Sequence, residues 1–454
     1  MKLRYSHHER NGRATERASV LVIVLLIAFG LISIALYFAN SMSLELRASD
    51  NRASGLAADQ IIEGAARYVS SVLVSYATNG AVPEIIQYQA EAVPLGKAKA
   101  PEENGRFWLI GRDPTGSPLS EPYFSLIDET SKLDLNAPWL TPGILSSNLP
   151  RTTFELADAM IDWRDTNGTG VSLNYAQLGY LPKHAPFETV GELRLVDGAT
   201  RDILVGEDIN QNGVLDANEN RNGLADPGLF DYFTVYSRQP NTHSDGTTLT
   251  NVNDQAGLRT LLEERLGASR AQTIIQSLSG GGGGPPAFAS LLQFYGAASR
   301  NAGMTADEFA LIYNDITVTN APFTNGRVNI NTAPVAVLAC LPGMDFDSAQ
   351  QLVNYRQSNP ASLTSIAWIM DALGSGRAAT LQALSEGDYI TTHSYQFTAD
   401  IAAVGPFGRG YRRVRFVFDI SEGTPKVVYR QDLSRLGWAL GRQTRDTWIA
   451  QDTR

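Results

Sequence analysis

Residues 19–40 read SVLVIVLLIAFGLISIALYFAN, and this stretch decides the fold of the chain. Residues 20–39 carry no charged side chain, and Gly30 and Ser33 are their only weakly apolar positions. Twenty residues at helical rise span about 30 Å, the thickness of the hydrocarbon core of a bilayer. We therefore expect one membrane-spanning helix. A cleaved secretory signal is disfavoured because the apolar run is too long, whereas a plain single-pass anchor stays an alternative.

The residues in front of the apolar run are basic. Five cationic side chains outweigh two carboxylates there: Lys2, Arg4, Arg10, Arg13 and Arg17 against Glu9 and Glu16. Basic segments that flank a membrane helix stay in the cytoplasm. We therefore expect a single-pass protein of the bacterial inner membrane, with the bulk of the chain in the periplasm.

The helix is expected to continue beyond the membrane. No proline occurs before residue 83, although the chain contains 21. Residues 43–80 are rich in helix-forming residues, and Asn79-Gly80 is a good stop signal. One helix over residues 19–79 would be about 90 Å long. A rough apolar stripe on its second half consists of Leu56, Ile61, Ala65, Tyr68, Val69 and Leu73.

This front end resembles a type IV prepilin. In that family a prepilin peptidase cuts directly before the apolar run, which corresponds to the bond between Ala18 and Ser19; the family usually has glycine where Ala18 stands. Major pilins carry a glutamate at the position of Ile23. A carboxylate in lipid is costly unless a neighbouring amine neutralises it. A subunit with no other subunit ahead of it has no such amine, so an apolar residue in place of the glutamate suits that position. In lacking this glutamate, the chain resembles the minor pseudopilin K family of type II secretion.

The body of the chain supports the same resemblance. Residues 127–137, IDETSKLDLNA, resemble a strand segment of the K family. The apolar stretches 107–110 and 123–127 flank a Pro/Gly turn and predict a hairpin. Residues 393–420 predict a second pair of strands, and residues 426–438 predict a last strand with a closing segment. These strands predict an antiparallel sheet.

A large helical insertion is expected between the strands. Residues 154–165, 189–200 and 256–278 show helical spacing, and the glycine run 280–284 with its following prolines predicts a loop. Residues 326–357 resemble a helix-hairpin-helix, or SAM-like, unit with helices over 335–341 and 347–356 around Pro342-Gly343. Asp345 and Asp347 at its turn would repel phosphate, so we expect a structural or protein-contact role and no nucleic acid.

The fold class is therefore α+β, with a type IV pilin-like N-terminal helix, an antiparallel sheet and a large inserted α-helical domain. The expected division has five parts: a leader over 1–18, a transmembrane and amphipathic helix over 19–80, a first pilin-like α/β part over 81–149, the insertion over 150–390, and strands with a C-terminal segment over 391–454.

One segment predicts a calcium loop. Residues 207–228 read EDINQNGVLDANENRNGLADPG and match the pattern D-x-[DN]-x-[DN]-G-x5-E. The first loop comprises Asp208, Asn210, Asn212, Gly213, Val214 through its carbonyl, Asp216 and Glu219. All of these ligands are oxygens, which suit calcium rather than zinc. The alternative is an Asn/Asp/Gly turn that favours left-handed backbone without an ion.

The pattern repeats ten residues later in a weaker form. The second loop would use Asn218, Asn220, Asn222, the carbonyl of Leu224, and Asp226. Its twelfth position is Leu229, and it overlaps the first loop, so the two can be one doubled site. Pro227-Gly228 breaks the exit, which favours a structural staple over a sensor. The resemblance to the K family also implies calcium in the inserted domain.

The composition argues against several classes of function. The formal net charge is −10 and the pI is about 5.1. An acidic chain is a poor general binder of phosphate. Cys340 is the single cysteine, which excludes an intramolecular disulfide and a cysteine-built metal site. Motifs of the type HExxH, GxGxxG, GxxxxGK[ST] and GxSxG do not occur, so we expect no enzyme.

The resemblance implies a minor pseudopilin that sits at the tip of the type II secretion pseudopilus and initiates or caps its assembly. The partners that it implies are minor pseudopilins I and J, other pseudopilins, the prepilin peptidase and the inner-membrane assembly platform. An alternative with the same front end is a minor pilin that acts as an adhesin or DNA receptor on a type IV pilus. A glutamate at position 23 and a basic hairpin would have favoured that alternative.

Overall fold

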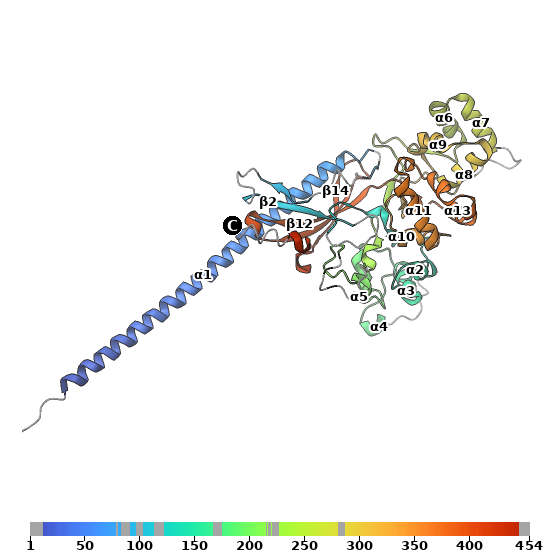
Figure 1. The fold of residues 1–454 in the computed structure, drawn as a ribbon. Helices are drawn as coiled ribbons and strands as arrows, with labels where there is room; N and C mark the ends of the chain where they lie inside the picture. The colour runs from blue at the N-terminus through green and yellow to red at the C-terminus, as the bar shows by residue number, and fades with distance from the viewer. Residues whose placement is uncertain are drawn as a thin grey trace, which may run out of the picture.

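The computed structural model places a long helical rod at one end and a folded head at the other (Figure 1). It describes residues 12–78, 80–82, 91–96, 103–112, 122–166, 175–214, 216, 219, 227–279 and 287–444. The head contains a sheet next to the rod and a helical region beyond the sheet (Figure 1). The fold is therefore α+β, as predicted.

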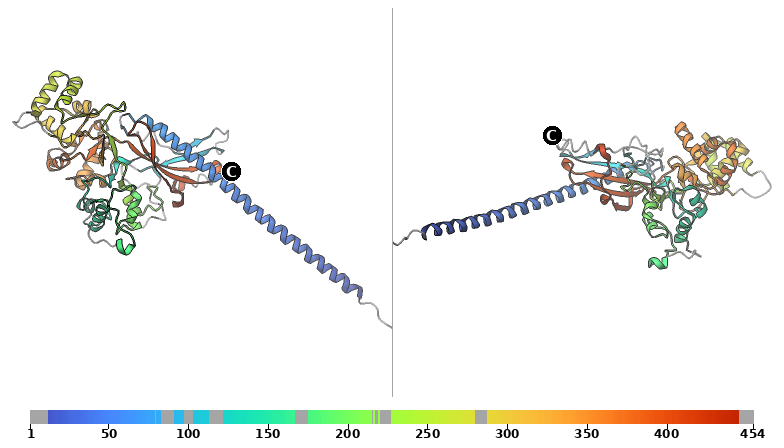
Figure 2. Two further views of the ribbon diagram at one scale, coloured as in Figure 1. Left: turned by 180° about the vertical axis from the view of Figure 1, so that it is seen from behind. Right: turned by 60° about the horizontal axis from the view of Figure 1, so that its bottom comes forward.

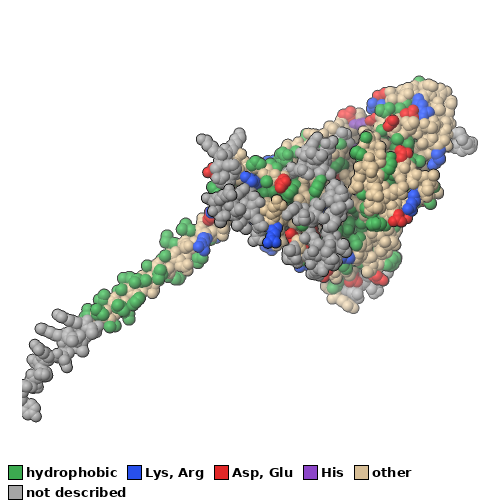
Figure 3. Space-filling view, viewed as in Figure 1, with side chains coloured by type: hydrophobic (Ala, Val, Ile, Leu, Met, Phe, Trp, Pro, Cys, Tyr) green, Lys and Arg blue, Asp and Glu red, His purple; other side chains and the backbone are tan. Residues whose placement is uncertain are grey.

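The rod is α1, Gly12–Val74, a helix of 63 residues. Its first half projects away from the head, and the apolar side chains over residues 20–38 are exposed (Figure 3). The helix is long and apolar enough to cross a membrane, with a mean hydropathy of 3.0 in its most apolar window. One N-terminal apolar helix is therefore present, as a membrane anchor requires.

The end of α1 differs from the prediction. The helix ends at Val74, and the next residues form tight turns in which Tyr76 N donates to Leu73 O at 3.0 Å and Ala77 N donates to Val74 O at 3.4 Å. Such i→i+3 bonds tighten the last turn of a helix. Gly80 has φ 61° and therefore takes the left-handed conformation predicted at the stop, whereas Asn79 lies outside the described residues.

The second half of α1 packs across one face of the sheet, which the view from behind shows (Figure 2). Ile61, Ala65, Val69 and Leu73 are buried there, as the stripe predicted. Leu56 and Tyr68 are 64% and 40% exposed, so the prediction was wrong for these two. The ring of Tyr68 touches that of Phe107 of β2 only along the border of the contact, with the centroids 5.7 Å apart, and Ala58, Ile62 and Ala66 are buried instead.

The sheet has six strands in the order β1-β2-β12-β13-β14, with β3 paired to β12, and every pairing in it is antiparallel. The strands are β1 Val93–Leu95, β2 Gly105–Ile110, β3 Ile127–Asp128, β12 Gln396–Val404, β13 Arg412–Asp419 and β14 Lys426–Asp432. The predicted pair of strands over residues 393–420 is confirmed as β12 and β13.

The predicted hairpin of residues 107–110 with 123–127 was wrong. Both β2 and β3 pair with β12, which is long enough to bind them one after the other along the same edge. Asp128 lies opposite Phe397, and Leu109 lies opposite Ile401. Between β2 and the segment before β3 only an isolated bridge joins Ile110 to Phe124 among the described residues.

The helical region has a core of its own that runs from Leu133 to Ile390 in the sequence. Its helices are α2 Pro142–Asn148, α3 Phe154–Arg164, α4 Tyr175–Leu178, α5 Arg201–Val205, α6 Gln255–Leu266, α7 Ala268–Ser279, α8 Leu291–Ala302, α9 Ala306–Tyr313, α10 Val335–Ala339, α11 Phe346–Ser358, α12 Trp368–Leu373 and α13 Ala378–Ser385. Four short strand pairs join distant segments: β4 Leu133–Asp134 with β5 Phe233–Thr234, β6 Arg238–Pro240 with β9 Phe323–Asn325, β7 Thr250–Asn251 with β8 Ile316–Thr317, and β10 Val328–Asn329 with β11 Ile390–Thr391.

Local signals explain where several of these helices end. The helical stretch predicted over residues 256–278 divides into α6 and α7 at Gly267, whose φ is 87°. Such a backbone conformation favours glycine and ends a helix. The stretch over residues 189–200 forms a short 3₁₀ helix, Val190–Leu195, in place of an α-helix. Thr189 and Glu192 form a capping box at its start.

The two helices of the predicted hairpin are present as α10 and α11. The first ends at Ala339, two residues earlier than predicted, and the second begins at Phe346. Gly343 has φ 75°, and a Cβ atom there would lie 2.4 Å from the Cβ of Ala383, so only glycine fits this turn. Cys340 is buried in the core, where burial raises the pKa of its thiol to about 12.

Candidate cation loop and its attachment to the sheet

The candidate cation loop starts after α5, which ends at Val205 and is followed by Gly206 with φ 70°. Gly206 forms an isolated bridge with Pro227, so the two ends of the loop segment lie side by side. The structure describes the first loop at Asp208, Asn210, Asn212, Gly213, Val214, Asp216 and Glu219. The residues of the second loop, Asn218, Asn220, Asn222, Leu224 and Asp226, lie outside the described residues.

Asp208 organises the turn at the start of the loop. Its carboxylate accepts from the backbone N–H of Asn212 at 2.9 Å and of Gly213 at 2.7 Å. Gly213 has φ 79°, the conformation for which the motif reserves a glycine at this position. The side-chain oxygens of Asn210 and Asn212 accept from the backbone N–H groups two residues later, at 3.0 and 2.9 Å. The side chains at positions one, three and five therefore shape the backbone of the loop.

The far end of the loop folds back onto its beginning. Glu219 accepts from the N–H of Asn210 at 3.1 Å and of Asp216 at 3.4 Å. One carboxylate oxygen of Asp216 lies 2.7 Å from the amide nitrogen of Asn210 and 3.3 Å from that of Asn212. The side chains at positions three and five thus contact the side chain at position nine, and the side chain at position twelve contacts the backbone of positions three and nine.

The loop places carboxylates in a poorly solvated position. Asn212 and Glu219 are 0% and 2% exposed. Burial raises the pKa of Glu219, and it also raises the pKa of Asp208 against the opposing charge of Arg112. Glu207, directly before the loop, is buried and has one carboxylate oxygen without a hydrogen-bond partner among the described residues. This set is rich in oxygen atoms and fits a hard cation.

The carboxylates do not converge on one point in this structure. Among the described residues, no group of three or more His, Cys, Asp or Glu side chains is close enough together to hold a metal ion. The amide groups of Asn210 and Asn212 lie against Asp216 and satisfy its charge locally. A bound cation would require both amides to turn their oxygens inward, a rotation that exchanges two groups of nearly equal size.

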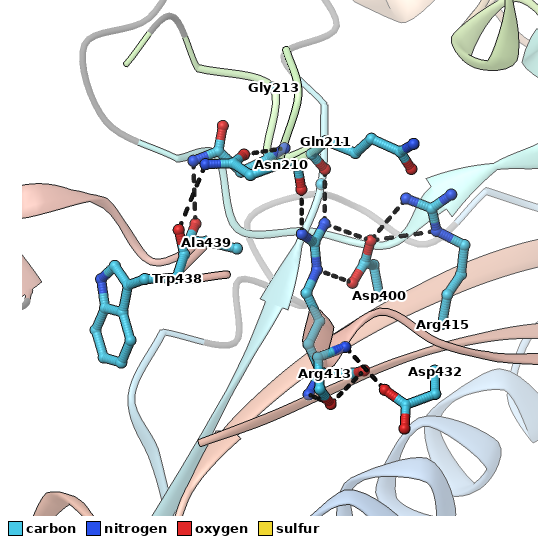
Figure 4. Close-up of polar contacts among 12 residues, drawn as sticks. Asn210, Gln211, Gly213, Asp400, Arg413, Arg415, Asp432, Trp438 and Ala439 are labelled. Atoms are coloured by element: carbon cyan, nitrogen blue, oxygen red, sulfur yellow. Dashed lines mark hydrogen bonds and ion pairs between the residues drawn. The ribbon is translucent and has the colours of Figure 1, made fainter. Parts of the chain in front are cut away.

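The loop is attached to the sheet through a buried guanidinium (Figure 4). Arg413, in β13, is fully buried and donates to both oxygens of Asp400, in β12, at 2.7 and 2.8 Å. Its remaining N–H groups donate to the backbone carbonyls of Asn210 and of Gln211, the latter at 2.6 Å. Arg415 also donates to Asp400, at 2.9 Å. Despite its burial, the two guanidiniums lower the pKa of Asp400 to about 2.

Two further contacts bind the same loop to neighbouring segments. Asn210 and Asn212 direct their amides at the carbonyls of Trp438 and Ala439, at 3.4 and 3.3 Å (Figure 4). On another side, Arg112 donates to the carbonyl of Gln211 at 3.2 Å. Arg112 is itself fixed by a two-pronged ion pair with Asp231 at 2.9 and 3.1 Å.

A second buried junction joins the sheet to the helical region at the segment IDETSK. Asp128 accepts from the hydroxyls of Thr332 and Ser394 at 2.5 and 2.7 Å. Burial raises its pKa to about 6. Glu129 accepts from Lys132 at 2.6 Å and from the hydroxyls of Thr234 and Thr398 at 2.6 and 2.7 Å. The motif that carries the resemblance to the K family therefore ties β12 to the helical region.

Two other features predicted from the sequence are the leader cleavage site and the helical hairpin. Ala18 and Ser19 lie within α1, where the structure describes the backbone. At the hairpin turn, Asp345 caps α11 by accepting from Ser348 N at 2.7 Å and pairs with Arg377 at 2.9 Å. Arg377 thus places a basic group beside the acidic turn, which the charge argument from the sequence did not include.

The sequence did not reveal Asp400, Arg413 or the two carbonyls at Trp438 and Ala439 as neighbours of the loop. They lie about 200 residues away in the chain, since the bonds of Arg413 to the loop span 203 and 202 positions. One signal was available: a charged residue at an inward position of an apolar strand, as in FTADIAAV, requires a buried partner.

Comparison with known proteins gives one family match. Residues 328–386 match the family model described as type II secretion system (T2SS), protein K. This segment begins at β10 and ends just after α13, so it includes the helical hairpin. No curated protein matches the chain.

Solved structures are similar to this chain at a low level. One of them is titled as the crystal structure of the GspK-GspI-GspJ complex from the enterotoxigenic Escherichia coli type 2 secretion system. The TM-score is 0.34 and the identity is 13%, over 82% of this chain and 98% of the other. A likeness at this level identifies neither a partner nor a site in this chain.

Proposed function

We propose, starting from its membership of the type II secretion system protein K family, that this chain is a minor pseudopilin at the tip of the secretion pseudopilus. The observation that carries the proposal is the family match of residues 328–386, on a chain whose N-terminal helix is apolar and unburied. This family consists of structural pseudopilins, which agrees with the expectation that the chain is not an enzyme.

The first part of the proposal concerns the anchor. The helix α1 inserts in the bacterial inner membrane, the head lies in the periplasm, and the peptidase cuts between Ala18 and Ser19. Mass analysis of the N-terminus of the protein from its native membrane tests the cut. A mature chain that starts at Ser19 is expected, whereas a start near residue 42 would indicate a secreted soluble protein and a retained Met1 would indicate an unprocessed anchor.

The second part concerns the tip. The helical region makes the head wide at the end remote from the membrane half of α1, a shape that would prevent another subunit from adding above it (Figure 1). Ile23 replaces the glutamate that an interior subunit uses. We infer that pseudopilins I and J assemble with this chain beneath its head, and that the helical hairpin serves protein contacts. The division at residues 80, 149 and 390 belongs to the same proposal.

Labelling of assembled filaments tests the position at the tip. An antibody against the helical region is expected to mark one end of each pseudopilus, and purification of the full chain in detergent is expected to recover pseudopilins I and J. Label along the length of the filament, or recovery without those partners, would contradict the tip assignment. Recovery of a type IV pilus in their place would favour the adhesin reading.

The third part is a structural calcium ion in the loop of residues 208–219. Asp208, Asn210, Asn212, Asp216 and Glu219 would hold it with side-chain oxygens, and Val214 would add its carbonyl. A bound calcium ion supplies positive charge to carboxylates that burial otherwise keeps poorly solvated. The complete motif and the raised pKa values of Asp208 and Glu219 support the proposal. Asn218, Asn220, Asn222, Leu224 and Asp226 would form a second or shared site.

Thermal unfolding of the full chain with and without a chelator tests the calcium site. A ligand at 100 times its dissociation constant stabilises a protein by about 2.7 kcal/mol, so chelation is expected to lower the Tm by several degrees. The double variant Asp208→Ala/Glu219→Ala is expected to lose this response. Glu263→Ala/Glu264→Ala is the matched control, because it removes two exposed carboxylates from α6. An unchanged Tm in excess chelator would remove the claim.

A further inference from the structure

The buried guanidinium of Arg413 divides its donors between two partners. Two N–H groups bind the carboxylate of Asp400, at 2.7 and 2.8 Å, and two bind the carbonyls of Asn210 and Gln211. Both Arg413 and Asp400 are 0% exposed. Only a planar group with several fixed donors can serve a carboxylate and two carbonyls at once, so lysine cannot replace this arginine.

The carbonyls that Arg413 binds belong to positions three and four of the candidate cation loop. Gln211, at position four, has φ 55°, an unfavourable conformation for a residue with a side chain. Its carbonyl receives one hydrogen bond from Arg413 at 2.6 Å and one from Arg112 at 3.2 Å. Two guanidiniums thus hold the loop in a shape that it would not keep by itself.

The same loop also donates hydrogen bonds to the C-terminal segment. The amides of Asn210 and Asn212 reach the carbonyls of Trp438 and Ala439 (Figure 4). Ala439 and Leu440 are buried against Trp108 of β2 and Ala402 of β12. The loop is therefore in contact with the sheet on one side and with a segment packed on that sheet on the other.

We infer that Arg413 is a positioning residue that pre-forms the cation loop and couples its occupancy to the packing of residues 438–440 on the sheet. This inference rests on the proposed calcium site. A pre-formed loop loses less freedom when it binds, so it binds more tightly. A bound ion turns the amide nitrogens of Asn210 and Asn212 away from the carbonyls of Trp438 and Ala439. Because coupling between two events is reciprocal, an ion in the loop therefore loosens the packing of the C-terminal segment.

Calcium titration of the full chain in detergent, by calorimetry, tests the inference. Arg413→Lys keeps the charge opposite Asp400 and is expected to weaken calcium binding at least tenfold. Arg415→Lys is the matched control, because Arg415 lies on the same strand and binds the same carboxylate but donates only to Asp400 in the bonds described above. Its affinity is expected to stay within about twofold of the parent. Equal affinities for the two variants would overturn the inference while leaving the calcium site intact.

Hydrogen exchange gives a second measurement that a purely structural role would not affect. Calcium is expected to speed exchange at residues 438–441 in the parent chain, because the bonds from Asn210 and Asn212 are lost, and not in Arg413→Lys. If that variant fails to fold, Arg112→Lys replaces it. This substitution weakens the second hydrogen bond to the carbonyl of Gln211, and the side chain of Arg112 is partly exposed. A severalfold loss of affinity is then expected, and unchanged affinity would overturn the inference. A parent chain that binds no calcium would overturn both the proposed site and this inference.

Discussion

Two buried carboxylates join the sheet to the helical region, and they differ in what surrounds them. Asp400 lies in β12 and meets two guanidiniums, whereas Asp128 lies in β3, paired to the same strand, and meets two hydroxyls. The pKa of Asp400 falls to about 2, and that of Asp128 rises to about 6. The strength of a buried junction and its response to pH therefore depend on the partner rather than on burial alone.

The two junctions serve different segments. Asp400 reaches the cation loop through Arg413, whose guanidinium binds the carboxylate of Asp400 and two backbone carbonyls of the loop. Asp128 reaches β10 and its following turn through neutral hydroxyls, with Asn329 donating to Ser394 at 2.8 Å. The first junction is a charge pair near neutral pH, because its two guanidiniums lower the pKa of Asp400 to about 2. The second can hold a proton near neutral pH.

The largest expected effect comes from breaking the charged junction. Asp400→Asn leaves Arg413 buried without its counter-charge, and such a loss typically destabilises a protein by about 3–5 kcal/mol. We expect a drop of that size in the apparent free energy of unfolding, measured by denaturant titration of the full chain followed by circular dichroism. Asp59→Asn is the control, since Asp59 of α1 pairs with Arg412 of β13 and both side chains are partly exposed. Similar effects of the two substitutions would show that the buried pair has no special weight.

The next effect is a pH response at the hydroxyl-lined junction. The pKa of Asp128 is about 6 in the folded chain and 3.8 ordinarily. The folded state therefore holds a proton more tightly, so the contribution of Asp128 to stability is full below pH 4 and is lost as the pH rises to about 6. One pKa unit corresponds to about 1.4 kcal/mol, which gives a loss of about 3 kcal/mol.

Asp128→Asn is expected to remove this loss, because the amide keeps the shape and has no proton to release. The difference in unfolding free energy between parent and variant should therefore change by about 3 kcal/mol between pH 4 and pH 7. Asp134, whose pKa burial raises to about 7, contributes a similar slope to both proteins and cancels in the difference. Parallel pH profiles for parent and variant would contradict the expected role of Asp128. Asp400, with a lowered pKa, contributes instead above pH 4 and loses its effect only as the pH falls toward 2.

The sequence predicted one side of each junction. Apolar spacing and the absence of proline predicted the long helix and its buried positions Ile61, Ala65, Val69 and Leu73, because a helix repeats every 3.6 residues. The motif predicted which loop residues share one turn, since loop spacing is local. Residues 127–137 resemble a segment of the K family, but the sequence did not predict the hydroxyl groups that bind Asp128 and Glu129.

The other side of each junction could not be predicted. Thr332 and Ser394 reach Asp128 over 204 and 266 positions, and Arg413 reaches the loop over about 200. No periodicity links residues at such separations, because the contact depends on how β12 pairs with two short strands in turn. The same cause made the hairpin prediction wrong: residues 107–110 and 123–127 are close in the chain, yet both found their partner in β12.

The smallest expected effect comes from an exposed ion pair, which shows what charge pairing contributes without burial. Arg430 of β14 lies 3.4 Å from Glu63 of α1, and both side chains are more than half exposed. An exposed ion pair contributes about 0–1 kcal/mol, because water screens the charges and both side chains lose freedom. Glu63→Gln is therefore expected to change the unfolding free energy by less than about 1 kcal/mol, and high salt should erase what it changes. A loss as large as that of Asp400→Asn would mean that the contact between α1 and β14 depends on charge, so that pairing rather than burial decides the strength of a junction in this molecule.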